Sequence, residues 1–293
     1  MKINLDTIIK FSSNNEKIDY YDEYSKLQLE KFAINIDNQI QNTLMRDLML
    51  KYAELSTTLE EKNKLLMKYN TDLEEMVNEK VKDISDLQIS TIFALVKLAE
   101  SRDDDTGAHI ERTSALCRVM AKLLRKTLKY EDLIDDKYVE DIYKASPLHD
   151  IGKVGIPDSI LLKPGKLTKE EFDIMKTHVN IGYDTLYEVQ KKFPKNSFLK
   201  MGMDITKYHH EKWDGSGYPD GIRGENIPLS GRIMAIVDVY DALRSKRIYK
   251  EPYSHEKTCM IIKEMKGKNF DPLLVDVFLE SNNDFKEVYE QII

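Results

Sequence analysis

The chain has 293 residues, of which 41% are hydrophobic and 32% charged, and a formal net charge of −7. This length allows one large domain with an accessory region, or two domains, and the negative charge argues against a protein that binds nucleic-acid polymers. Two cysteines are too few for a disulfide framework, no apolar run is long enough to span a membrane, and the start has no signal-peptide core. We therefore expect a cytoplasmic protein without membrane contact.

Glycine and proline are absent from residues 1–106, and all 12 glycines and 8 prolines lie from Gly107 onward. A segment this long without a helix breaker predicts helical structure. Residues 1–45 show only modest apolar patterning, so we expect a short helical N-terminal region, interrupted at residues 12–15. The sequence does not indicate what this region senses.

A heptad pattern is regular in the next region, residues 46–88. Its apolar positions alternate in steps of four and three, with one polar break at Lys62, and the seam consists of Leu55, Leu59, Lys62, Leu66, Tyr69, Leu73 and Met76. One interpretation is a single long amphipathic helix packed on its own domain. The interpretation we favour is a parallel two-stranded coiled coil that makes the protein a homodimer, with a one-residue shift of the seam near Val77.

Residues 89–293 show helical spacing and no useful strand alternation, so we predict an all-α fold. A capping box at Thr168 and Glu171 opens a helix that we expect to run to about Gln190. Residues 211–228 read as a loop dense in glycine, proline and aspartate. The expected helices cover residues 90–102, 109–128, 136–145, 168–190, 230–244, 254–265 and 271–280, and residues 198–208 precede His209.

Five of the six histidines lie in contexts typical of metal ligands. The adjacent pair His149 and Asp150 diverges by about 100° on a helix, so it can reach one ion, or two ions through a bridging carboxylate. Five imidazoles with three carboxylates suit a site of two or three ions, and the absence of thiolate favours iron, manganese or zinc. The candidates are Asp105, His109, His149, Asp150, His178, His209, His210 and Asp238. We expect the sixth histidine, His255, to be a surface residue.

The sequence from about residue 90 to residue 285 resembles the HD-GYP domain, a branch of the HD phosphohydrolase superfamily that degrades cyclic di-GMP. The long signature from His209 to Gly221 contains the triplet Gly217-Tyr218-Pro219 that names the family. The other matching segments are Glu100–His109, His149–Lys153, Leu161–Lys166 and Asp238–Leu243. The resemblance covers about two thirds of the chain and none of residues 1–45, and predicts that residues 89–293 form the catalytic domain.

The resemblance implies a metal centre of two or three transition-metal ions, iron or manganese, with zinc or nickel as alternatives. Asp150 bridges the ions in this assignment. Asp105 stands where members with three metals carry a glutamate, and the alternative is that it is only a helix-terminal acid. The ligands implied by the match are His109, His149, Asp150, His178, His209, His210 and Asp238.

The same resemblance implies roles in substrate binding. Lys153 matches a lysine that contacts the scissile phosphate, and Arg247 and Lys250 match basic residues that hold ligand phosphate. Tyr218 and Pro219 lie in the loop that shapes the substrate pocket and that also contacts signalling proteins.

The implied activity is metal-dependent hydrolysis of cyclic di-GMP to linear pGpG, to GMP or to both, through a metal-bridged hydroxide. One alternative is a receptor that binds a cyclic dinucleotide without turnover. Another is a hydrolase of a different cyclic dinucleotide, such as cyclic GMP-AMP. Because Lys153 and the matched ligands are all retained, we favour the enzyme over the receptor.

Overall fold

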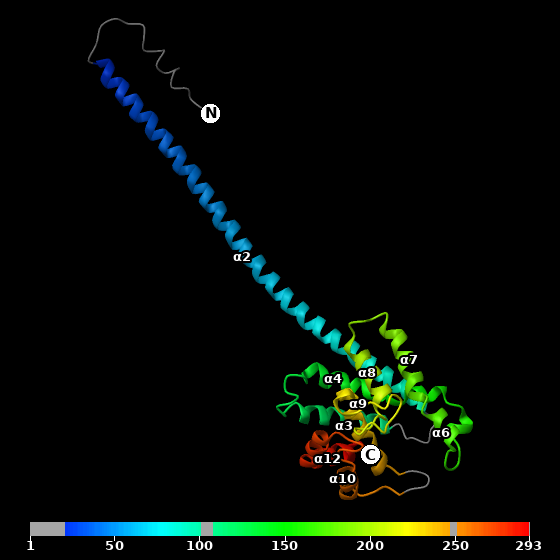
Figure 1. The fold of residues 1–293 in the computed structure, drawn as a ribbon. Coiled ribbons are helices and arrows are strands. Elements are labelled where there is room, and N and C mark those ends of the chain that lie inside the picture. The colour runs from blue at the N-terminus through cyan, green and yellow to red at the C-terminus, as the bar shows by residue number, and fades with distance from the viewer. Residues whose placement is uncertain (1–20, 101–107, 247–250, 293) are drawn as a thin grey trace. The chain divides into compact units, whose positions relative to one another are not determined.

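The computed structural model describes residues 21–100, 108–246 and 251–292, which form α-helices joined by loops and short 3-10 helices (Figure 1). These residues contain no β-strand, only an isolated bridge between Lys266 and Phe270. The prediction of an all-α fold is therefore confirmed. The chain divides into two compact units, residues 1–81 and residues 82–293.

The described part of the first unit is the N-terminal part of α2 (Tyr21–Glu100), which is one uninterrupted helix. We expected separate short helices before residue 45, but residues 21–45 belong to α2, because neither glycine nor proline interrupts the chain there. Residues 1–20, including the expected break at residues 12–15, lie outside the described residues.

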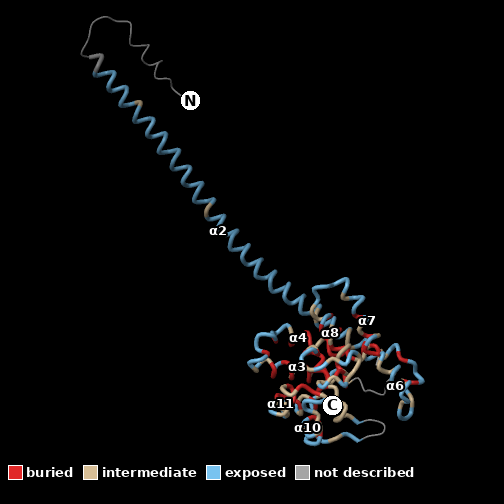
Figure 2. The backbone as a smooth tube through the Cα atoms, in the orientation of Figure 1, coloured by how far each residue is buried: buried red, intermediate tan, exposed pale blue. Residues whose placement is uncertain are grey.

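The heptad seam of α2 is exposed in a single chain. Its apolar members from Leu55 to Met76 are 57% to 67% exposed. Figure 2 shows that exposure continues along most of α2. Such a row of large apolar side chains in water is unfavourable by about 25 cal/mol for each Å² that a partner would cover.

The second unit is a bundle around the central helices α3 (Ala108–Leu124), α8 (Ser197–Tyr208) and α9 (Leu229–Arg244). Helix α3 packs against α9 and against α4 (Asp136–Ala145), which in turn packs against α8. The other elements are η2 (Ser146–Gly155), α5 (Asp158–Leu161), α6 (Lys169–Met175), α7 (His178–Gln190), η3 (Gly224–Asn226), α10 (His255–Glu264), α11 (Pro272–Glu280) and α12 (Asn282–Gln291). Figure 2 shows the buried residues concentrated among these helices.

The apolar core of this unit joins segments that are far apart in the sequence. Its fully buried members come from α3, α4, α8, α9 and the C-terminal helices, and include Leu116, Met120, Ile142, Ile205, Ile233, Tyr240, Phe278 and Phe285. The rings of Tyr240, Phe278 and Phe285 pack edge to face, with centroids 4.9 to 5.8 Å apart. Helix α12, which the sequence did not predict, closes this end of the core.

The predicted capping box is present. The Thr168 hydroxyl accepts a hydrogen bond from the Glu171 backbone N–H at 3.2 Å, and Glu171 accepts one from the Thr168 N–H at 2.7 Å. The expected helix to Gln190 is divided, because α6 ends at Met175 and α7 begins at His178. The division places His178 at a helix start.

Asp204 of α8 gives the fold a pH-dependent stability. Burial raises the pKa of its carboxyl from 3.8 to about 6. The folded protein therefore binds more protons than the unfolded chain between these pH values, so the free energy of unfolding falls as pH rises through this window. The loss is up to about 3 kcal/mol.

We expect Asp204→Asn to raise the free energy of unfolding at pH 7.5 by about 1 to 3 kcal/mol, with no gain at pH 4, because the amide cannot ionise. Urea unfolding followed through Trp213, the single tryptophan, measures this change. Asp184→Asn, at an exposed position of α7, is the matched control. An Asp204→Asn effect that is the same at both pH values would contradict the assignment.

Candidate metal centre

His149 and Asp150 lie on η2, where close backbone packing brings α7 against them. A Cβ atom on Gly152 would lie 1.9 Å from the His178 carbonyl oxygen and 2.6 Å from the Gly182 nitrogen. Only glycine permits this approach, which sets His178 beside Asp150. The Thr206 hydroxyl of α8 donates to the Leu148 carbonyl at 2.8 Å, so α8 is joined to the same segment.

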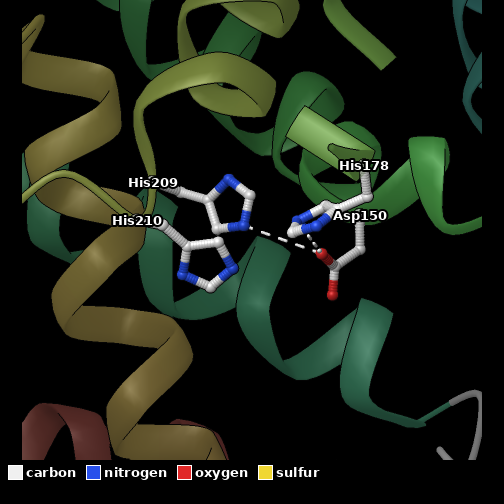
Figure 3. A group of neighbouring side chains, drawn as sticks. All are labelled: Asp150, His178, His209 and His210. Carbon is white, nitrogen blue, oxygen red and sulfur yellow. Dashed lines mark ion pairs between the residues drawn. The ribbon is translucent and has the colours of Figure 1, made fainter. Parts of the chain in front are cut away.

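The candidate ligands form two groups. In the first group, Asp150 of η2 faces His178 at the start of α7 and the adjacent His209 and His210, which directly follow α8 (Figure 3). The second group consists of His109 of α3, His149 of η2 and Asp238 of α9. In each group the potential ligand atoms lie within 4.8 Å of one another. Seven of the eight candidates are thus brought together, and Asp105 lies outside the described residues.

The Asp150 carboxylate faces both groups. Its Oδ1 lies 3.2 Å from His178 Nε2 and 3.6 Å from His209 Nε2. Its Oδ2 lies 3.4 Å from His149 Nε2. His149 Nε2 is also 3.5 Å from His109 Nε2. One oxygen is therefore available to each group, which is the arrangement that a bridging carboxylate requires.

Three histidines are held in the tautomer that suits a metal ligand. The Nδ1 atoms of His149, His178 and His209 lie 2.9, 2.7 and 3.0 Å from the backbone carbonyls of Ser146, Met175 and Ile205. A carbonyl only accepts hydrogen bonds, so each Nδ1 carries the proton and each Nε2 offers its lone pair. The same partner fixes the plane of each ring.

The atoms that face one another in the first group are left without hydrogen bonds. Asp150 Oδ1, His178 Nε2 and His209 Nε2 are buried and have no hydrogen-bond partner among the described residues. Buried polar atoms without a partner are costly, and three acceptors directed at one point are satisfied together by a cation. The residues present therefore fit a metal ion.

The charge states also fit metal binding. Burial lowers the pKa of His209 and His210, which keeps both imidazoles neutral near pH 7. Burial alone would raise the pKa of Asp150, but the Lys153 ammonium and His149 hold it well below its usual range. Lys153 Nζ lies 2.9 Å from Asp150 Oδ2. The centre thus combines neutral nitrogen ligands with an ionised carboxylate.

Asp241 is a residue of the centre to which the sequence analysis gave no role. It is 1% exposed, and its Oδ2 accepts a hydrogen bond from His109 Nδ1 at 2.7 Å. Arg112 holds the same carboxylate through Nε at 2.6 Å and Nη2 at 3.0 Å. A signal was present, because Asp238 and Asp241 are three residues apart and share one face of α9.

Among the expected substrate-binding residues, the structure places Tyr218 beside the first group. The Tyr218 ring centroid is 4.8 Å from that of His210, and Pro219 follows it, half-buried. Arg247 and Lys250 lie outside the described residues.

The expectation that His255 is a surface residue is wrong. Its side chain is buried, with Nδ1 2.9 Å from the Tyr240 hydroxyl and Nε2 2.9 Å from Asn282 Oδ1. The reason is α12, which begins at Asn282 and covers this end of α10. His255 belongs to neither group of candidate ligands.

Comparison with known protein families matches residues 94–274 to the HD domain. Two relatives from Vibrio cholerae serotype O1 are a "probable cyclic di-GMP phosphodiesterase", 44% identical over 228 residues, and a "cyclic di-GMP phosphodiesterase", 49% identical over 211 residues. These alignments cover 78% and 72% of this chain but 52% and 42% of the relatives.

A third relative from the same organism is a "3'3'-cGAMP-specific phosphodiesterase 2", 40% identical over 203 residues, which are 69% of this chain and 36% of that protein. This chain thus spans about half, or less, of the length of the curated relatives that it matches. None of the helices in the described part of the chain has the length and apolar character that a membrane crossing requires.

The chain belongs to the HD domain family, as the match over residues 94–274 shows. Within that family it is a member of the HD-GYP branch, whose signature it carries from His209 to Gly221.

Proposed function

We propose that this protein is a metal-dependent phosphodiesterase that hydrolyses cyclic di-GMP to linear pGpG, to GMP or to both. The observation that carries the proposal is the position of Asp150, which has one carboxylate oxygen toward each group of histidines and Lys153 beside it. The names of two relatives at 44% and 49% identity support the same substrate.

The proposal assigns one ion to each group of side chains. Asp150, His178, His209 and His210 would hold one ion, and His109, His149 and Asp238 would hold a second, with Asp150 shared. Iron or manganese suits these nitrogen and oxygen ligands, with zinc and nickel as alternatives, and a third ion would need Asp105. When bound, the ions would supply Lewis acidity to the phosphate and lower the pKa of a water molecule.

Lys153 supplies a positive charge beside the candidate ligands. It is three residues from Asp150 on η2, and this spacing holds its ammonium 2.9 Å from the Asp150 carboxylate. From there it can contact the scissile phosphate and donate a proton toward the departing 3′ oxygen. Arg247 and Lys250 would hold the other phosphate, and Tyr218 and Pro219 would line the pocket. The Gly217-Tyr218-Pro219 loop would also contact signalling proteins in the cytoplasm.

An assay of the full chain under anaerobic conditions tests the activity. The protein is reconstituted with iron or manganese, its metal content is measured, and it is incubated with cyclic di-GMP before the products are separated. Linear pGpG or GMP supports the enzyme, whereas tight binding without product identifies a receptor. Cyclic GMP-AMP is assayed in parallel, because one relative at 40% identity is named for that substrate. Faster hydrolysis of cyclic GMP-AMP would reassign the substrate.

We also propose that α2 pairs in parallel with α2 of a second copy. Counting the seam back from Leu55 in heptad steps places Tyr52, Leu48 and Met45 on the same face, and all three are exposed. In a parallel pair each g position faces the partner's e position five residues on. The pairs are Lys51 with Ser56, Thr58 with Asn63, Leu65 with Asn70 and Asp72 with Val77. None brings like charges together.

We expect the full chain to be a dimer by light scattering at micromolar concentration, and Leu59→Lys combined with Leu66→Lys to be a monomer. Two lysines at the seam of each chain place four positive charges in the apolar interface of a pair. Each replaced leucine also removes about 2 kcal/mol or more of stabilisation from apolar burial. Glu61→Lys, away from the seam, is the matched control and should remain dimeric. A wild-type monomer would end the coiled-coil interpretation.

A further inference from the structure

His210 is held differently from the other histidines of the centre. The Nδ1 atoms of His149, His178 and His209 have backbone carbonyl partners, and that of His109 has Asp241. Within the described residues the ring of His210 has no hydrogen-bond partner. Because a metal site needs each ring fixed within a narrow range of angles, something else must orient His210.

Ring packing surrounds His210 instead. Its ring centroid is 4.0 Å from that of His209 and 5.3 Å from that of His178, both members of the same group. On another side the Tyr218 ring lies 4.8 Å away, inclined by 32°. Tyr218 is not one of the histidines and aspartates of the group, and its ring is the support that the loop provides.

Tyr218 is itself held in place through its ring. Phe172 of α6 meets it edge to face at 6.2 Å and 82°. Lys176 Nζ lies 5.3 Å from the Phe172 ring centroid and 6.0 Å from that of Tyr218, where a cation is attracted to the ring faces. Helix α6 thus backs the ring that contacts His210.

The loop is also fixed on both sides of Tyr218. A Cβ atom on Gly217 would lie 2.4 Å from the Lys212 nitrogen and 2.5 Å from Glu211 Cα, so the chain folds back here only with glycine. After Tyr218, the backbone N–H groups of Asp220 and Gly221 donate to Glu211 Oε1 at 2.7 and 2.9 Å. Glu211 directly follows His210, so the loop is anchored beside the ligand that it supports.

We propose that Tyr218 is a positioning residue for His210, and that its ring sets the affinity of the Asp150, His178, His209 and His210 group for its metal ion. The contact is made by the ring and not by the hydroxyl. Phenylalanine should therefore replace tyrosine, whereas alanine should leave His210 without support. The inference rests on the metal centre of the proposed function but is independent of substrate and turnover.

Titration of the metal-free full chain with Co²⁺ tests the proposal, because the visible absorption of cobalt reports the number and geometry of its nitrogen ligands. Wild type should bind two ions. Tyr218→Ala should lower the affinity for one of them by about 10- to 100-fold, the usual range for loss of a residue that orients a ligand. It should also change the absorption bands of that ion. Tyr218→Phe should bind both ions as wild type does.

Asp241→Asn is the matched variant for the other group, because Asp241 orients His109 as Tyr218 is proposed to orient His210. Asp241→Asn should lower the affinity for the other ion, and it should leave unchanged the absorption bands that Tyr218→Ala alters. If Tyr218 acted only through overall folding, Tyr218→Ala would lower the affinity for both ions together. If Tyr218→Ala disturbs the loop itself, Trp213 fluorescence would show it. In that case Phe172→Ala removes the backing of the ring from outside the loop, and it should lower the affinity for the same ion by less than Tyr218→Ala does.

Two results would overturn the proposal. The first is a folded Tyr218→Ala protein that binds both ions with wild-type affinity and unchanged absorption bands. The second is a Tyr218→Phe protein as impaired as Tyr218→Ala, which would assign the effect to the hydroxyl. A wild-type chain that binds fewer than two cobalt ions would exclude the proposed metal centre, and this inference with it. The wild-type titration therefore distinguishes failure of the proposed function from failure of the Tyr218 inference alone.

Discussion

Asp150→Asn is expected to lower the turnover of cyclic di-GMP by about 10³-fold or more and to remove at least one metal ion per chain. The amide has nearly the same size as the carboxylate, so the fold should be unchanged. It has no negative charge, however, and only one of its two terminal atoms can bind a cation. One of the two groups would lose its oxygen and the other would keep only a neutral one, because Oδ1 faces His178 and Oδ2 faces His149.

The measurement pairs elemental analysis after anaerobic reconstitution with the rate of product formation. Asp184→Asn makes the same chemical change on the exposed side of α7 and should leave both quantities unchanged. If Asp150→Asn protein retained two ions and a rate within tenfold of wild type, the shared-carboxylate assignment would be wrong.

Lys153→Ala is expected to lower turnover by about 10²- to 10⁴-fold while the metal content stays at the wild-type value. Lysine is a poor metal ligand when protonated, so its loss removes no coordinating atom. What is lost is a positive charge and a proton 2.9 Å from the Asp150 carboxylate, where the phosphate would be bound. Lys153→Arg keeps the charge but not the geometry or the ease of proton transfer, and should recover only part of the rate.

Rates and metal content of the two Lys153 variants are measured together. Lys163→Ala removes another half-buried lysine, which pairs with Glu171 at 2.6 Å, and serves as the control for loss of charge. Near-wild-type turnover in Lys153→Ala would exclude the proposed role. Loss of metal in the same variant would show instead that Lys153 stabilises the ligand cluster.

Much of the candidate centre was predictable because its ligands are rare residue types in recognisable segments. Six histidines in 293 residues leave few combinations, and His149-Asp150 and His209-His210 are adjacent pairs. The all-α class was likewise predictable from apolar spacing, and the capping box at Thr168 from a local pattern that forms before any tertiary contact. These features depend on neighbours within about four residues, which sequence specifies directly.

Other features depend on contacts between distant segments. The end of α6 before His178 could not be predicted from neighbouring residues, because apolar residues continue at helical spacing across the break. His255 was misjudged because Asn282 and α12, which bury it, lie 27 residues or more away. Asp241 lies in the matched segment Asp238–Leu243, but its role is visible only where His109 and Arg112 reach it from α3.

By itself the sequence determined the helical class, the set of candidate ligands and the heptad seam, since each is a matter of residue type and spacing along one chain. The tertiary structure alone decided how the ligands divide into groups, with His149 beside His109 while its neighbour Asp150 faces His178. It also placed the Tyr218 ring 4.8 Å from that of His210. The physical reason is that metal binding requires atoms within a few ångströms. Only the packing of η2 against α7, α8 and α3, and of α3 against α9, brings the candidate ligands that close.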